Sequence, residues 1–143
     1  MMKKLVLFFL ITVSLVGCQQ KPNADTISFI NGYWEIEEVQ TPESETKVYT
    51  ENTSVDYIEL ENSEGFRQKM MPQFDGKYLT NNLKENIKLT EEDNRYFLDC
   101  STEYAQWREE IIDIDSTHLI IKNDKNITYK YKRFEPFNIQ IDE

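Results

Sequence analysis

The residues that could catalyse a reaction or bind a metal are few in this chain of 143 residues. His118 is the only histidine, so a zinc site built from several histidines cannot form within one chain. Glu109 and Glu110 are adjacent in a segment that alternates like a strand, so they point to opposite faces and cannot act as a carboxylate pair. No nucleophile motif, phosphate loop or dinucleotide-binding glycine pattern occurs. The sequence therefore predicts a protein that is not an enzyme and needs neither a metal nor a cofactor.

Cys18 is the one residue whose position indicates a defined chemistry. Two lysines precede the apolar run 5–16, and Gly17 stands directly before the cysteine. Twelve residues rise about 18 Å as a helix, which is too short for a bilayer core of about 30 Å. The segment "LVGC" resembles the bacterial lipobox, in which the cysteine receives a diacylglyceryl group before the leader is removed. We expect a signal peptide over residues 1–17 and a lasting acyl anchor on Cys18.

The polar segment that follows is expected to separate this anchor from a folded domain. Residues 18–30 begin with "CQQKPNADT" and are predicted to be a tether, with the domain over residues 31–143. Gln19, rather than aspartate, follows the cysteine, and by analogy with Gram-negative sorting this favours the outer membrane. The domain would then face the periplasm or the cell surface, in the cell envelope in either case.

The charge of the mature chain limits the classes of partner it can bind, and its cysteine content limits its disulfides. Without residues 1–17 the chain has 14 basic and 26 acidic residues, a net charge of about −12. This acidity argues against nucleic acid as a partner, because the phosphates would be repelled. Cys100 has no second cysteine to pair with once Cys18 is acylated, and it lies in an alternating segment. We expect it to be a small buried hydrophobic residue.

From residue 32 onward, apolar and polar side chains alternate with the period of a β-strand. A further short edge strand is expected around "KVYT" within residues 40–54, and no stretch has a helical period. Closing so many short strands on themselves removes exposed edges. The sequence predicts an all-β domain, an antiparallel up-and-down barrel of about 8–10 strands. The predicted strands, separated by turn-forming clusters, are 33–39, 56–60, 66–71, 77–80, 86–89, 95–100, 105–114, 118–122 and 127–134.

The first and last of these strands carry side chains suited to closing a barrel. In the last strand Tyr129, Tyr131 and Arg133 share one face and lysines occupy the other, so we expect the tyrosine face to be the dry one. An inward guanidinium needs a partner, and the ring of Trp34 in the first strand offers one. "GYW", which begins at Gly32, is similar to the G-x-W motif of lipocalins, and Arg133 to the arginine that stacks on that tryptophan. The resemblance implies a structural role for these residues: closing the barrel floor.

Other segments resemble the lipocalin-like lipoproteins of Flavobacteria and related Bacteroidetes. They are "DYIEL", "GFRQKMMPQFDGKYL", the W-x-E of Trp107 and Glu109, and "YKRFEP". The resemblance covers nearly the whole mature chain. It implies a lipocalin-like barrel carried on a lipid anchor, and it names no substrate.

An aromatic-rich interior is the remaining candidate site. Large apolar groups mixed with a few polar ones are typical of a ligand pocket, and they also fit a packed core. We expect non-catalytic binding of a small hydrophobic or amphipathic ligand. The alternative is an envelope protein–protein interaction or inhibitor module with a solid barrel; a ligand-sized cavity would favour the first. The residues expected to line the cavity, grouped by shared strand face, are Phe66, Gln68 and Met70; Tyr96 and Leu98; Trp107 and Glu109; Tyr129 and Tyr131.

Overall fold

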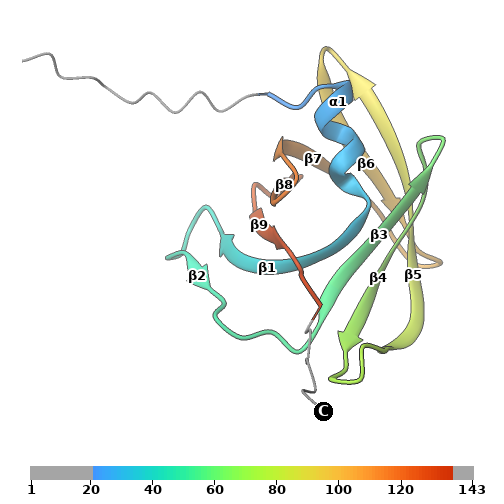
Figure 1. Cartoon of the computed structure of the whole chain (residues 1–143). Coiled ribbons are helices and arrows are strands. Elements are labelled where there is room, and N and C mark those ends of the chain that lie inside the picture. Colours follow the sequence, from blue (N-terminus) through green and yellow to red (C-terminus); the bar gives the residue numbers. More distant parts are fainter. Residues whose placement is uncertain (1–20, 137–143) are drawn as a thin grey trace, which may run out of the picture.

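A computed structural model describes residues 21–136, which form a β-barrel (Figure 1). A short helix, α1 (Ala24–Ile27), and a 3-10 turn, η1 (Ser28–Ile30), come before the strands. The strands are β1 (Gly32–Gln40), β2 (Lys47–Val48), β3 (Val55–Glu61), β4 (Glu64–Pro72), β5 (Tyr78–Glu92), β6 (Arg95–Ser101), β7 (Gln106–Ile114), β8 (His118–Asn123) and β9 (Thr128–Arg133).

The strands follow one another around the barrel in nearly the order of the chain. Each strand from β3 to β9 pairs antiparallel with the next, and β1 pairs with both β3 and β9. The β1–β9 pairing closes the sheet, so eight strands form the barrel and β2 lies on β1 as a short addition. The predicted all-β, antiparallel up-and-down barrel of about 8–10 strands is confirmed. The edge strand expected near "KVYT" is also present.

Tight turns with left-handed backbone join several neighbouring strands. Asn62 and Ser63 connect β3 to β4 with φ angles of 51° and 68°, and Asp93 and Asn94 connect β5 to β6 with φ angles of 52° and 59°. Asparagine and aspartate enter this region more readily than most residues, because their short polar side chains form local hydrogen bonds. These turns fall in clusters that the sequence marks as turns, and so the strand order follows the prediction here.

One predicted break between strands is absent. The segments 77–80 and 86–89 are predicted as two strands, but both belong to the single long strand β5. The polar residues between them form an irregularity, where the register against β4 shifts between Gln68 and Met70. Asn82 takes a φ of 60° there. The extra residues bend the strand without ending it, and a polar composition alone does not distinguish such a bulge from a turn.

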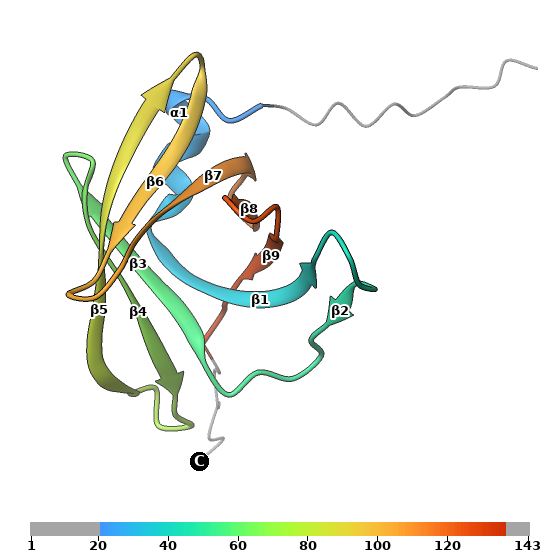
Figure 2. The ribbon, with the colours of Figure 1, turned by 180° about the vertical axis from the view of Figure 1, so that it is seen from behind.

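The folded domain begins earlier than predicted. Asn23 and Thr26 form a capping box that starts α1. Ile27 and Ile30 are buried in the barrel core, because this helix and turn lie across one end of the barrel (Figures 1 and 2). The expected tether over residues 18–30 is therefore too long, and the domain does not start at residue 31.

Residues 1–20 and 137–143 lie outside the described part of the chain. The signal peptide over residues 1–17 and the acyl anchor on Cys18 fall in this part and stay predictions. Within residues 21–136, no helix combines the length and apolar character needed to cross a membrane.

Gly32, Trp34 and Arg133 meet where α1 and η1 cover the barrel, which we call the closed end. The guanidinium carbon of Arg133 lies 3.8 Å from the centroid of the Trp34 ring, so the expected stacking contact is present. The same guanidinium donates hydrogen bonds to the backbone carbonyls of Phe29 at 2.6 Å and Asn31 at 2.8 Å. Gly32 has a φ of +124°, and a Cβ at this position would lie 2.5 Å from Arg133 Nη1. Only glycine fits here without strain.

Apolar side chains form a core that extends from the closed end into the barrel. Cys100 is one of them, and burial raises the pKa of its thiol to about 12. This agrees with the prediction of a buried hydrophobic residue, since a reactive cysteine needs a thiolate near neutral pH. The core consists of Ile27, Ile30, Trp34, Ile58, Ile87, Leu98, Cys100, Ile111, Ile114, Leu119, Ile121 and Tyr131.

Candidate functional site

Beyond the apolar core, the barrel interior carries charged side chains. Asp56 alternates with Tyr57 and so shares the inner face of β3 with Ile58. Across the β3–β4 ladder, Lys69 lies opposite Asp56 and Arg67 lies opposite Ile58. The inward-facing charged residues, which we call the charged layer, are Asp56, Arg67, Lys69, Glu85 and Glu109.

Arg67 is the centre of this layer. Its side chain is only 12% exposed, and it donates to Glu109 through Nη1 at 2.8 Å and Nη2 at 3.0 Å. Its Nε donates to Glu85 at 2.6 Å, and the indole N–H of Trp107 donates to Glu109 at 3.0 Å. Burial alone would lower the pKa of Arg67, but its hydrogen bonds to Glu109 and the charges of both carboxylates raise it well above its ordinary value. The guanidinium thus stays charged inside the barrel, where each of its three nitrogens donates to a carboxylate.

A second ion pair lies nearer to solvent. Lys69 Nζ is 2.8 Å from Asp56 Oδ1, with the lysine side chain 60% exposed and the aspartate side chain 8% exposed. The Tyr131 hydroxyl also bonds to Asp56, and burial together with this carboxylate raises the pKa of Tyr131 well above its ordinary value. Tyr129, two residues before Tyr131 on the same face, differs from it. The Tyr129 hydroxyl has no hydrogen-bond partner among the described residues.

The charged layer borders three hollows, one of which lies beside β5 and is also lined by Gln68 and Lys84. The other two adjoin each other, and we call them the mouth cavity. Their volumes are about 310 Å³ and about 280 Å³, and neither is lined by α1 or η1. Asp56, Lys69, Tyr129 and Tyr131 line both hollows. Trp107, Glu109 and Glu85 line the second, whereas the first extends outward to Val39, Tyr49, Asn52 and Ser54. Aromatic rings and paired charges together suit an amphipathic small molecule.

The residues expected to line a cavity divide into three groups. Trp107, Glu109, Tyr129 and Tyr131 line the mouth cavity. Tyr96 and Leu98 face inward but belong to the apolar core, where Leu98 is fully buried. The structure does not bring these two to the cavity.

The third group, Phe66, Gln68 and Met70, lies on the outer face of β4 and does not line the mouth cavity. Gln68 on this face is nonetheless only 5% exposed, and it lines a separate hollow with Arg67 and Glu85. Gln68 lies opposite the outward Tyr57, and the Phe66 ring contacts Tyr57 at 6.0 Å and lies under Lys84 Nζ at 3.9 Å. The prediction assigned the apolar face of β4 to the interior. The opposite face turns inward because carboxylates on three other strands surround Arg67 and Lys69, while aromatic neighbours cover the apolar face from outside.

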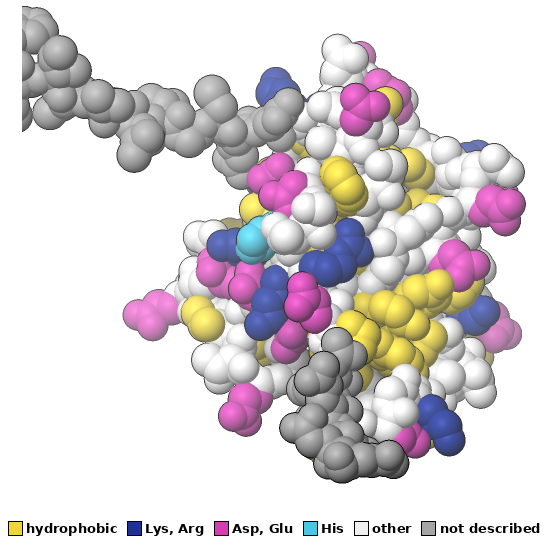
Figure 3. Space-filling model, viewed as in Figure 1, with side chains coloured by type: hydrophobic (Ala, Val, Ile, Leu, Met, Phe, Trp, Pro, Cys, Tyr) yellow, Lys and Arg dark blue, Asp and Glu magenta, His cyan; other side chains and the backbone are white. Residues whose placement is uncertain are grey.

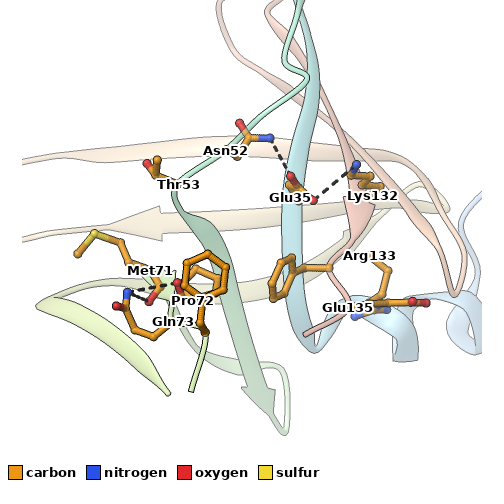
Figure 4. Close-up of a pocket in the computed structure, with 11 residues that line it drawn as sticks. Glu35, Asn52, Thr53, Met71, Pro72, Gln73, Lys132, Arg133 and Glu135 are labelled. Carbon is orange, nitrogen blue, oxygen red and sulfur yellow. Dashed lines mark hydrogen bonds and ion pairs between the residues drawn. The ribbon is translucent and has the colours of Figure 1, made fainter. Parts of the chain in front are cut away.

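Another hollow, of about 660 Å³, lies outside the barrel beside the β4–β5 turn. Figure 4 shows Glu35 between Asn52 and Lys132, with Met71 and Gln73 across the hollow. Asn52 Nδ2 donates to Glu35 at 3.0 Å, and Lys132 Nζ lies 3.6 Å from the same carboxylate. These polar groups already pair with one another, and Met71 at 42% exposure does not form a closed wall. The mouth cavity is therefore the better enclosed candidate.

Comparison with known proteins adds one likeness. No protein-family model matches the chain, and no curated protein matches it. Among solved structures, the chain is similar to one described as apocrustacyanin C1 crystals grown in space and earth. The two share 12% identity at a TM-score of 0.48, over 81% of this chain and 67% of that chain. The fold assignment rests instead on the strand pairing and on the contact between Trp34 and Arg133.

Sequence reasoning missed four of the five charged-layer residues. Glu109 was expected, but Asp56, Arg67, Lys69 and Glu85 were not. One signal was available in "DYIEL", where the inward Ile58 requires Asp56 to face inward as well. A buried carboxylate then calls for a cation on the neighbouring strand. Within residues 21–136, no cluster of three or more His, Cys, Asp or Glu side chains is placed to hold a metal ion.

Proposed function

We propose that this chain is a lipid-anchored envelope protein that binds a small amphipathic molecule in the mouth cavity of its barrel, without catalysing a reaction. The observation that carries the proposal is the division of the interior. The closed end and the core beside it are packed with apolar side chains, whereas the other part retains two open hollows lined by tyrosines, Trp107 and paired charges. A barrel serving only as a scaffold gains nothing from burying ion pairs there, because desolvation costs about as much as their attraction returns.

The location in this proposal rests on the sequence before the described residues. Cys18 in "LVGC" would carry the acyl anchor, and Gln19 favours the outer membrane of a Gram-negative cell. Replacing Cys18 by serine is expected to release the protein from membranes or to leave an uncleaved precursor. If a Cys18→Ser variant were processed normally and still sedimented with membranes in high salt, the anchor would be wrong.

The binding proposal can be tested with two tryptophan substitutions at adjacent positions. Ser54 lines the mouth cavity and Thr53 lines the exterior hollow. The protein purified from its own host should release a small molecule that native mass spectrometry detects. Ser54→Trp should abolish this co-purification because the indole fills the cavity, and Thr53→Trp should not. Loss of the molecule in Thr53→Trp alone would move the site to the exterior hollow. Absence of any bound molecule in the unmodified protein would contradict the proposal.

A second candidate is an interaction module for another envelope protein, favoured by aromatic side chains outside the barrel. Tyr33 contacts Tyr57 at 4.7 Å and stacks on Tyr78 at 4.6 Å, both distances between ring centroids. Hydrophobic side chains gather over β3, β4 and β5 on the face shown in Figure 3. This alternative predicts that Tyr57→Ala removes a partner from in-cell crosslinks without altering small-molecule binding. The open mouth cavity argues against the solid barrel that this alternative assumed.

A further inference from the structure

The charges that face the mouth cavity do not balance. Asp56, Glu85 and Glu109 contribute three negative charges, and Arg67 and Lys69 contribute two positive charges. Lys69 pairs with Asp56, whereas Arg67 alone serves both Glu85 and Glu109. One negative charge in the cavity wall is therefore left without its own cation.

This surplus charge is accessible at Glu85. Its Oε2 accepts from Arg67 Nε at 2.6 Å, and its side chain is 37% exposed while it lines the cavity. Glu109 is the opposite case, because its side chain is 8% exposed and both of its oxygens accept from Arg67. A second cation can therefore approach at Glu85 without breaking an existing pair.

Aromatic rings line the same hollow. Trp107, Tyr129 and Tyr131 share it with Glu85. The faces of such rings attract ammonium groups, by about 0.5–2 kcal/mol per contact depending on desolvation. The net charge of the whole chain, −10, favours the approach of cations as well. An anionic ligand is disfavoured, because Arg67 already bonds to two carboxylates and a further negative charge would enlarge the imbalance.

We infer that the molecule bound in the mouth cavity carries a cationic group, a protonated amine or a quaternary ammonium, placed beside Glu85 and the aromatic rings. This inference rests on the function proposed above and specifies its ligand class. The apolar part of the ligand would lie toward Ile36, Val39 and Tyr49 of the first hollow.

Three probes that share a benzyl group test the inference: benzyltrimethylammonium, benzyl alcohol and phenylacetate. The whole protein is held in lipid nanodiscs, with empty nanodiscs as the blank, and affinities are measured by isothermal titration calorimetry. Benzyltrimethylammonium should bind about tenfold or more tightly than phenylacetate. Glu85→Gln should reduce this ratio about threefold or more, since the amide still accepts from Arg67 but has no charge. Glu64→Gln, at an exposed position outside the cavity, removes the same charge and should leave the ratio unchanged.

Equal affinity for the three probes, or tighter binding of phenylacetate, would overturn the cationic ligand while leaving a binding barrel in place. An equal effect of Glu85→Gln and Glu64→Gln would also overturn it, because only the overall charge would then matter. Failure of all three probes to bind counts against the cationic ligand too. The broader function is judged separately by the molecules that co-purify with the protein, so the two failures can be told apart.

Discussion

The closed end and the mouth of the barrel are each organised by one arginine, and the two arginines are held in different ways. Arg133 lies on the ring of Trp34 and donates to backbone carbonyls, and burial lowers its pKa. Arg67 has no such backbone acceptors; two carboxylates from other strands surround it and raise its pKa despite burial. Backbone acceptors are present whenever the fold forms, so Arg133 stabilises the barrel itself. Side-chain carboxylates can be changed without changing the fold, so the surroundings of Arg67 are suited to specificity.

The largest effect should come from removing Arg67. Arg67→Met leaves Glu109 buried without a cation, and we expect a loss of about 3–5 kcal/mol in the free energy of unfolding. Urea unfolding at neutral pH measures it. Combining Arg67→Met with Glu109→Gln should recover most of the loss, because the amide is neutral and still accepts from Trp107. A single-variant loss below about 1 kcal/mol would show that the buried pair is solvated after all.

Arg133→Ala should have a smaller effect, about 1–3 kcal/mol, through loss of the cation–π contact and of its hydrogen bonds to the backbone. The Arg133→Lys variant should be less stable than the unmodified protein and more stable than Arg133→Ala. An ammonium keeps the charge but cannot reach the same set of carbonyls as a planar guanidinium. Binding at the mouth should be unchanged in both variants. If Arg133→Ala impaired binding more than stability, the division between the two ends would be incorrect.

Tyr129 and Tyr131 on β9 allow a test of which side chains at the mouth stabilise the fold and which bind a ligand. Tyr131→Phe should cost about 1 kcal/mol in the empty protein, because its hydroxyl bonds to the buried Asp56. Tyr129→Phe should leave the stability of the empty protein nearly unchanged and should weaken ligand binding instead, since its hydroxyl is free to meet a ligand. Denaturant midpoints and probe affinities for both variants provide the measurement. Equal destabilisation by both substitutions would mean that the Tyr129 hydroxyl is also used within the fold.

The smallest effect is expected for an ion pair on the outer surface. Arg108 donates to Asp99 at 2.6 Å and, with Thr90, lowers the pKa of Asp99, although partial burial opposes the shift. Because the folded pKa lies below the unfolded one, the pair stabilises above pH of about 4 and loses its effect as the pH falls through the folded value. Asp99→Asn should cost less than about 1 kcal/mol at pH 7 and little near pH 3. A loss that persisted at low pH would assign the effect to packing.

Much of the barrel could be predicted because its determinants are local. Alternation identified most strands, and the turn residues at 62–63 and 93–94 marked where hairpins end. The contact between Trp34 and Arg133 could be expected because these residues lie in the first and last strands of the barrel, which pair when the barrel closes. Local signals were insufficient for β5, where a bulge and a turn have the same polar composition, and for α1, which is too short to show a helical period.

The amino-acid sequence by itself determined the all-β class and the strand order, since alternation and turn chemistry act within a few residues. The contact of Trp34 with Arg133 was expected from the inward faces of the first and last strands and from the resemblance to lipocalins. Only the tertiary structure decided which face of β4 is the inner one. Alternation defines two faces but does not say which faces inward, and Phe66 with Met70 suggested the wrong one. The choice depends on Glu109, 42 residues away from Arg67 in the chain. The charged mouth exists because a buried guanidinium is stable only where folding brings distant carboxylates to it.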